Sequence, residues 1–188
     1  FGVDTVSASL MPYFQDFDRD GDLDFFLLTN RLFLAGGRPK DPPFRKGADG
    51  RPEVLPPFQK HFRMREAAEG IMKLEATGLK DQLYRNDGGI FKEVSVAAGI
   101  VERGHGLSAA WWDYDDDGDP DLYVANDFND PDYLYRNDGG TFVDVISDTF
   151  PHISWFAMGS DLADLDGNGG DDLFTLDMSG TNHFRQKT

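Results

Sequence analysis

The seven-residue stretch LYRNDGG occurs twice in the chain, at Leu83–Gly89 and again at Leu134–Gly140. The two copies are 51 residues apart. Two acidic stretches, DYDDDGDPD from Asp113 and DLDGNGGDD from Asp164, are separated by the same 51 residues. Matching words at one fixed offset indicate an internal repeat, and a repeat of about this length is typical of solenoids, propellers and repeat arrays.

A third acidic stretch, DFDRDGDLD, begins at Asp16 and lies 97 residues before Asp113, which is 46 more than one repeat. We therefore expect an insertion of 46 residues in the first repeat. Residues 31–80 are irregular and resemble no other copy, so we place the insertion there. The register is supported by bulky apolar residues two positions before each acidic stretch: Phe14, Trp111 and Leu162.

The three acidic stretches share the pattern D-x-D-x-[DN]-G-x-x-D, which predicts loops that each hold one cation. Oxygen-bearing side chains at alternate positions can surround a hard cation, glycine at the sixth position permits a sharp turn, and the seventh position supplies a backbone carbonyl. Calcium accepts six to eight oxygen ligands, and no loop contains the Cys or His that zinc or copper would favour. We predict about three Ca²⁺ ions. The predicted ligands are Asp16, Asp18, Asp20, Asp22 and Asp24 in the first loop, Asp113, Asp115, Asp117, Asp119 and Asp121 in the second, and Asp164, Asp166, Asn168, Gly170 and Asp172 in the third.

The main alternative for such loops is the EF-hand, which requires a glutamate at position 12 and a helix on each side. Position 12 is Leu27, Val124 or Thr175 here, and the stretches that follow, DFFLLT, DLYVAN and DLFTLD, are typical of strands. A solvated acidic turn is the second alternative, and three loops in one register argue against it. No loop offers a catalytic partner, so we expect the calcium to be structural.

The segments around the loops predict an all-β fold. LYRNDGGIFKEV and LYRNDGGTFVDV each place an Asn-Asp-Gly-Gly turn between two short apolar-alternating runs, which is typical of a β-hairpin. With GLSAAWWD before a loop and DLYVAN after it, each repeat supplies about four strands. We therefore expect β-propeller blades, which are four-stranded antiparallel sheets, in about three repeats of 51 residues; a solenoid is the alternative.

FDRDGDLDFFLLTN, AWWDYDDDGDPDLYVAND, LYRNDGGTFVDV and FAMGSDLADLDGNGGDDLFTLDM resemble FG-GAP or VCBS repeats, the blades of integrin-α-type propellers. More narrowly, they resemble the cartilage-acidic-protein-like group that is often found with an ASPIC/UnbV domain. The resemblance covers nearly all of the chain except the insertion. It implies a secreted or cell-surface seven-bladed propeller that has calcium in its blade loops and acts as a binding module. Asn168 and Gly170 depart from the acidic pattern, which implies a weaker third site.

The number of repeats leaves the proposed propeller incomplete. Without the insertion, the 188 residues supply fewer than three 51-residue repeats, whereas propellers have four to eight blades. Taking residues 1–188 as a partial propeller, we consider three possibilities: the chain is a segment of a longer protein, several chains complete one structure, or open ends join into a filament.

The insertion, residues 31–80, is basic and is predicted to contain one helix. It begins with a Pro- and Gly-rich loop and continues with apolar residues at helical spacing, namely Met64, Ala67, Ala68, Ile71 and Leu74. It carries 11 of the 18 Lys and Arg but only 6 of the 34 Asp and Glu. It could bind an acidic ligand such as a carboxylated glycan, or it could be a positive cover on an acidic body.

The net charge of −16 limits the functions that the chain can have. Outside the insertion the charge is −21, which argues against nucleic acid as a partner, because phosphate contacts need clustered Lys and Arg. No apolar run is long enough to span a membrane. The sequence offers no recognisable set of acid, base and nucleophile, so we do not expect an enzyme. We expect a calcium-binding extracellular module for recognition or adhesion of protein or carbohydrate, or else a structural protomer of a calcium-dependent fibre or multi-chain assembly.

Overall fold

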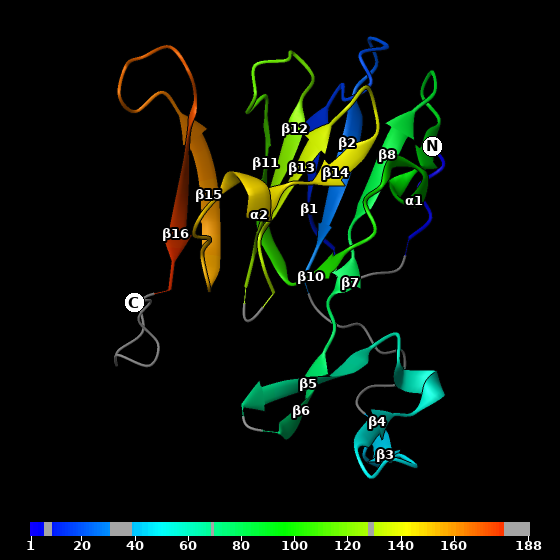
Figure 1. Cartoon of the computed structure of the whole chain (residues 1–188). Helices are drawn as coiled ribbons and strands as arrows, with labels where there is room; N and C mark the ends of the chain where they lie inside the picture. The colour runs from blue at the N-terminus through cyan, green and yellow to red at the C-terminus, as the bar shows by residue number, and fades with distance from the viewer. Residues whose placement is uncertain (6–8, 31–38, 69, 128–129, 179–188) are drawn as a thin grey trace.

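In the computed structural model, each acidic loop joins the first two strands of an antiparallel sheet. The structure describes residues 1–5, 9–30, 39–68, 70–127 and 130–178. Two four-stranded sheets and one two-stranded sheet lie side by side (Figure 1). The first sheet has the order β1 (Ser9–Gln15), β2 (Asp24–Thr29), β8 (Gln82–Asn86) and β9 (Phe91–Glu93). The second has the order β11 (Gly106–Trp112), β12 (Asp121–Asn126), β13 (Tyr133–Asn137) and β14 (Phe142–Asp144), and the third pairs β15 (Ala157–Ala163) with β16 (Asp172–Asp177).

The sheets keep the register that the sequence predicts. Phe25 of β2 pairs with Tyr84 of β8, and Leu122 of β12 pairs with Tyr135 of β13, so equivalent residues meet in both sheets. A four-residue helix follows each complete sheet, α1 (Ser95–Ala98) after the first and α2 (Ile146–Thr149) after the second. The all-β prediction is therefore confirmed. The described residues form an open arc of sheets and no closed ring.

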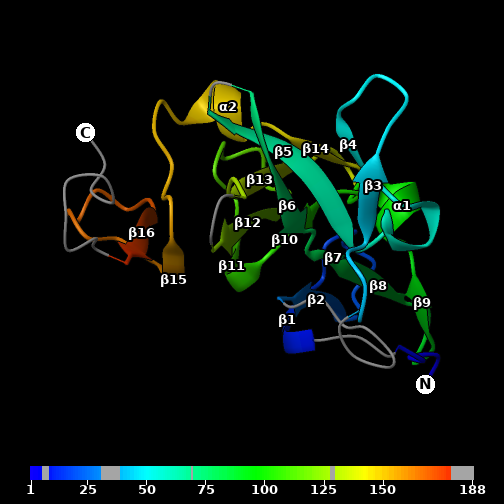
Figure 2. The same ribbon diagram turned by 90° about the horizontal axis from the view of Figure 1, so that it is seen from below.

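Residues between β2 and β8 leave the first sheet and form two hairpins at its end opposite the acidic loops (Figures 1 and 2). These are β3 (Phe44–Lys46) with β4 (Pro52–Val54), and β5 (Phe62–Ala68) with β6 (Ile71–Ala76), separated by a 3₁₀ turn at Pro56–Phe58. A two-stranded pair, β7 (Leu79–Lys80) with β10 (Arg103–Gly104), connects this region to the sheets.

The predicted helix in the insertion is wrong, because its residues form the β5–β6 hairpin. Phe62 pairs with Ala76 and Met64 with Leu74, so the apolar residues follow the period of two as well as the helical one. Gly70 decides between the two periods. It adopts φ +81° between the strands, a left-handed conformation that turns the chain and would interrupt a helix.

Arg63 on β5 attaches the insertion to the second sheet. Its guanidinium lies 2.7 Å from Oδ1 of the buried Asp130, and His105 contacts the other oxygen of that carboxylate at 2.5 Å. Burial would raise the pKa of Asp130, but the hydrogen bonds from His105 and Arg63 outweigh it and lower that pKa. This contact fits the interpretation of the insertion as a positive cover on an acidic body.

Both faces of the second sheet are buried, which explains why every residue of β12 is buried. Leu122 and Val124 belong to a cluster shared with Phe26 and Leu28 of the first sheet. Tyr123 and Ala125 point the other way and pack in a second cluster that includes Leu173 of the third sheet. Trp111, on the first-sheet side, donates its indole N–H to the Tyr13 carbonyl at 3.0 Å.

The two outer faces of the arc expose apolar side chains. On the first sheet Phe14 is 55% exposed and stands against Phe25, which stacks on Tyr84 with ring centroids 4.7 Å apart. On the third sheet Phe174 and Leu176 are 52% and 56% exposed. The first and third sheets thus each present an apolar outer face.

Gly99 ends α1 and fits closely against the second sheet. It adopts φ +92°, and a Cβ atom there would lie 2.3 Å from the carbonyl oxygen of Phe142. Gly2 lies 97 residues earlier, at φ +77°, and its Cβ would lie 2.2 Å from the carbonyl oxygen of Phe91. The residues around Gly2 therefore contact the first sheet as those around Gly99 contact the second, which extends the repeat to the first residues of the chain.

We predict that Gly99→Ala destabilises the protein more than Gly139→Ala. Gly139 is also left-handed, at φ +61°, but a Cβ there would have nothing within 4 Å. The control should lose only the conformational term, about 1 kcal/mol, whereas Gly99→Ala should lose at least about 1 kcal/mol more through the clash. Urea denaturation of the two variants measures the difference, and equal losses would contradict the tight contact.

A second prediction concerns Asp81, a buried acid between β7 and β8. Its Oδ1 accepts hydrogen bonds from the Thr29 amide at 2.7 Å and the Thr29 hydroxyl at 3.0 Å. Burial raises the pKa of Asp81 to about 7, against an ordinary value of 3.8, although the Thr29 hydrogen bonds lower it. The folded state therefore binds more protons than the unfolded state between these two values, and stability falls as pH rises through that range.

We expect the wild-type protein to be more stable at about pH 5 than at about pH 8, with up to about 3 kcal/mol of the difference due to Asp81. Asp81→Asn keeps an oxygen acceptor for Thr29 and cannot ionise, so it should remove this part of the pH dependence. Denaturant titrations of both proteins at both pH values test it. The same pH dependence in both proteins would show that Asp81 does not titrate as described.

Candidate metal-binding loops

The three acidic loops lie at the same end of the arc, between β1 and β2, β11 and β12, and β15 and β16 (Figure 1). They share a backbone conformation. The fourth position of each loop is left-handed, with φ of 59° at Arg19, 59° at Asp116 and 76° at Gly167, and the glycine at the sixth position is left-handed too. Two non-glycine residues hold this unfavourable conformation, which indicates that the loop shape is imposed by its other contacts.

Three carboxylates converge in each loop, at its first, third and ninth positions. One oxygen from each carboxylate lies within 4.8 Å of the corresponding oxygens of the other two. These triads are Asp16, Asp18 and Asp24; Asp113, Asp115 and Asp121; and Asp164, Asp166 and Asp172. The arrangement could hold a metal ion, and nine of the predicted ligands come together in this way.

The fifth and seventh positions have other contacts. Oδ1 of Asp20, Asp117 and Asn168 each accepts the amide two residues later, at 2.8–2.9 Å. The seventh-position carboxylates of Asp22 and Asp119 accept the amides of Gly88 and Gly139, at 3.1 and 3.0 Å. These side chains therefore shape the loop and join it to the Asn-Asp-Gly-Gly turn. Their role as calcium ligands, and that of Gly170, stays a prediction.

The ninth-position aspartates of the first two loops are fully buried and bond to both neighbouring segments. Asp24 accepts the amide of Phe17 at 3.1 Å and that of Asn86 at 2.8 Å. Asp121 accepts the equivalent amides of Tyr114 at 3.0 Å and Asn137 at 2.7 Å. Each aspartate thus connects the start of its loop to the third strand of its sheet.

The asparagine of LYRNDGG supports the loops through hydrogen bonds, and the loop pattern alone missed it. Its amide group donates to the carbonyl at the eighth loop position, Leu23 for Asn86 and Pro120 for Asn137. Its Oδ1 accepts the amide of the second turn glycine, at 2.6 Å in the first sheet and 2.7 Å in the second. The signal was the repeated word itself, which pairs one asparagine with each complete loop.

Burial leaves these carboxylates in an unfavourable electrostatic state. It raises the pKa of Asp24 and of Asp121 to about 6, even though two backbone hydrogen bonds on each lower it, and nearby acids raise it further. Asp18 also has a raised pKa, chiefly through burial and then through Asp20. A divalent cation would offset this clustered negative charge.

Asp113 gives the strongest indication that a cation fits. Its Oδ1 is buried and has no hydrogen-bond partner. The equivalent aspartates are satisfied by backbone amides. Asp16 accepts those of Asp20 and Gly21 at 3.1 and 3.0 Å, and Asp164 accepts three. A buried, unpartnered carboxylate oxygen is costly, and a calcium ion held by Asp113, Asp115 and Asp121 would satisfy it.

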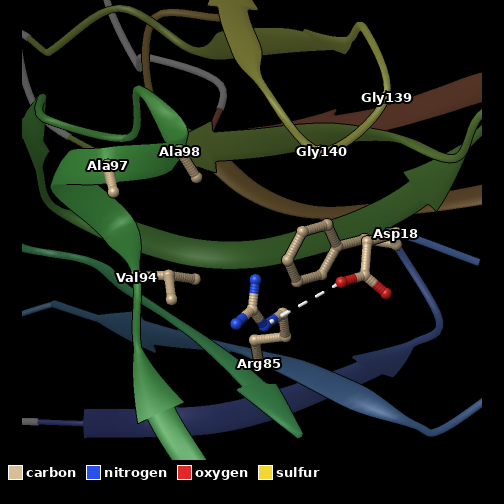
Figure 3. Close-up of a pocket in the computed structure, with 8 residues that line it drawn as sticks. Asp18, Arg85, Val94, Ala97, Ala98, Gly139 and Gly140 are labelled. Carbon is tan, nitrogen blue, oxygen red and sulfur yellow. Dashed lines mark ion pairs between the residues drawn. The ribbon is translucent and has the colours of Figure 1, made fainter. Parts of the chain in front are cut away.

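A cavity of about 220 Å³ lies where the first loop meets the second sheet (Figure 3). Asp18 and Arg85 come from the first sheet, Val94 and Ala98 from the segment at α1, and the glycine turn from the second sheet. Arg85 lies 4.0 Å from Asp18 and 2.8 Å from Asp87. The first loop therefore adjoins the junction between the first and second sheets and is not an isolated turn.

Residues 113–175 match the family model described as FG-GAP-like repeat. The matched segment runs from the first residue of the second loop to the strand after the third, so it contains both acidic loops and one complete LYRNDGG hairpin. This supports the FG-GAP family. No curated protein matches the chain significantly.

We predict that Asp113→Asn lowers stability in calcium but not in chelator. In chelator the substitution removes an unpartnered buried charge, so stability should be unchanged or higher. In calcium it removes a ligand, so the stabilisation by calcium should fall. Thermal unfolding in both buffers measures the two effects.

Asp16→Asn is the matched control at the first position of the first loop. Asp16 holds two amides, so its substitution should lower stability by about 1 kcal/mol even in chelator. If both variants lose the same stability in chelator, Asp113 has no special need for a cation.

Proposed function

We propose that the chain is a calcium-stabilised segment of a β-propeller that acts outside the cell as a recognition or adhesion module for protein or carbohydrate. The observation that carries the proposal is the set of three carboxylate triads at one end of the arc, with the unpartnered Asp113 oxygen in the second. The FG-GAP-like match supports the repeat type and, through it, an extracellular location. Extracellular calcium is abundant enough to fill even weak loops.

Calcium has a structural role in this proposal. The ion would bridge carboxylates that otherwise repel one another, and the ninth-position aspartates would carry that order to the neighbouring strands through hydrogen bonds. The described residues contain no helix that is long and apolar enough to cross a membrane. We propose binding and not catalysis, and the ASPIC/UnbV-associated group as the narrower relationship.

A second function, as a structural protomer of a calcium-dependent assembly, is favoured by the exposed apolar side chains on both outer faces. Phe14 on one face, and Phe174 and Leu176 on the other, are about half exposed. Sheets of a propeller bury such faces against neighbouring blades, as both faces of the second sheet are buried here. Copies joined through these faces head to tail would form a ring or a filament.

One experiment tests the calcium proposal and separates the two functions. We expect chelation to lower the thermal midpoint. The free energy of unfolding should fall by about 2.7 kcal/mol per site if free calcium was about 100 times Kd before chelation. Magnesium should restore little, because it requires a stricter octahedron and retains its waters. An unchanged midpoint after chelation would contradict calcium binding.

Light scattering on the same samples distinguishes the module from the protomer. A recognition module should be a monomer in calcium. A structural protomer should form a multimer that dissociates on chelation, because the loops then lose the shape that positions the outer faces.

A further inference from the structure

Asn137 links the first loop to the second. It ends β13, is fully buried, and its side-chain amide donates two hydrogen bonds to different sheets. One goes to the carbonyl of Phe17, the second residue of the first loop, at 2.9 Å. The other goes to the carbonyl of Pro120 in the second loop, at 3.1 Å.

These bonds complete a path between the two carboxylate triads. Asp24 of the first triad accepts the amide of Phe17, whose carbonyl accepts from the Asn137 side chain. The Asn137 backbone amide donates to Asp121 of the second triad at 2.7 Å. Phe17, Asp24, Asp121 and Asn137 are each at most 3% exposed, so water does not compete for these bonds.

Arg19 forms a second, weaker link. It occupies the fourth position of the first loop, and its guanidinium lies 3.2 Å from Asp119 in the second loop. Asp119 also accepts the amide of Gly139 in the turn that follows Asn137. Because Arg19 is half exposed, this ion pair should contribute less than the buried Asn137 bonds.

We propose that the first and second loops bind calcium as a cooperative pair, coupled mainly through Asn137 and partly through Arg19. The inference rests on the proposed function. An ion in the first loop fixes Asp24, and through it the backbone of Phe17. The Phe17 carbonyl then holds the side chain of Asn137 in place. The backbone amide of Asn137 in turn orients Asp121 for the second ion. Linkage makes the effect reciprocal, so an ion in either loop raises the affinity of the other.

The third loop lies outside this pair. Among the residues that the structure describes, no hydrogen bond or ion pair joins residues 113–121 to residues 164–172. The contact between the second and third sheets is mainly apolar, with Tyr114 and Leu173 beside the same cluster.

Terbium luminescence can report chiefly on the second loop. Tyr114 is its second residue, between the ligands Asp113 and Asp115, whereas Phe17 and Leu165 occupy that position in the other loops. Terbium in place of calcium, sensitised by Tyr114, therefore reports chiefly the second loop, and calcium competition gives its calcium affinity. Salt is kept near physiological strength so that repulsion between ions is screened.

The first comparison removes one neighbouring site at a time by matched substitutions at loop positions one and three. Asp16→Asn/Asp18→Asn should lower the affinity of the second loop at least about fivefold, within the range usual for coupled sites. Asp164→Asn/Asp166→Asn should change it less than about twofold. Equal effects of the two double variants, or none from the first, would overturn the coupling. Absence of saturable binding in the wild-type protein would instead overturn the proposed function.

The second comparison assigns the coupling to Asn137. Asn86 is its equivalent in the first sheet and makes the same bonds to its own loop and turn, with no bond across sheets among the described residues. In an Asn137→Ala background the fivefold effect of Asp16→Asn/Asp18→Asn should disappear, whereas in an Asn86→Ala background it should remain. Circular dichroism checks that each variant is folded. Arg19→Ala, at a half-exposed position, should reduce the effect in part, and it replaces Asn137→Ala as the test if that variant does not fold. An undiminished effect in Arg19→Ala would contradict the proposed path.

Discussion

The buried hydrogen bonds of the ninth-position aspartates hold each complete repeat together. Asp24 and Asp121 lie where a loop, its own second strand and the third strand of the sheet meet, and each carboxylate accepts one amide from the loop and one from that third strand. A buried carboxylate must be satisfied on both oxygens to be tolerated. This requirement fixes the loop, the strand order and the position of the Asn-Asp-Gly-Gly turn at once. It also places two negative charges in the interior beside further acids, which a bound cation would stabilise.

The sequence predicted the repeat period, the all-β class and ligand sets that include the triads, because each can be read from short patterns and their spacing along the chain. The fixed offset between the two LYRNDGG words gave the register of the second sheet, and the β-branched and aromatic residues of DLYVAN predicted a strand. The period-two pattern cannot say which neighbour covers each face. Only the structure shows that Leu122 and Val124 face the first sheet whereas Tyr123 and Ala125 face the third.

The failures of prediction have physical reasons too. In the insertion, Met64 and Leu74 fit both a helix and a hairpin, and the left-handed Gly70 between the strands favours the hairpin. The link through Asn137 depends on residue 17 lying beside residue 137, a contact between loops 120 positions apart that no local pattern encodes. The unpartnered oxygen of Asp113 could not be predicted either. The three loops share one sequence pattern but differ in which backbone amides reach the first aspartate. Local chemistry could be read from the sequence, whereas the partners across sheets could not.

The acidic loops and the insertion lie at opposite ends of the strands (Figure 1). The loops contain 15 of the 34 acidic residues, and the described part of the insertion carries nine basic residues against five acidic ones. The molecule therefore has a large electric dipole along the strands, which persists when the loops hold divalent ions because the carboxylates still outnumber the added charge. Near a negatively charged surface the protein would turn its insertion toward that surface within about 10 Å, the distance over which salt leaves the field effective. The loops would then face away into solution, where free calcium can reach them.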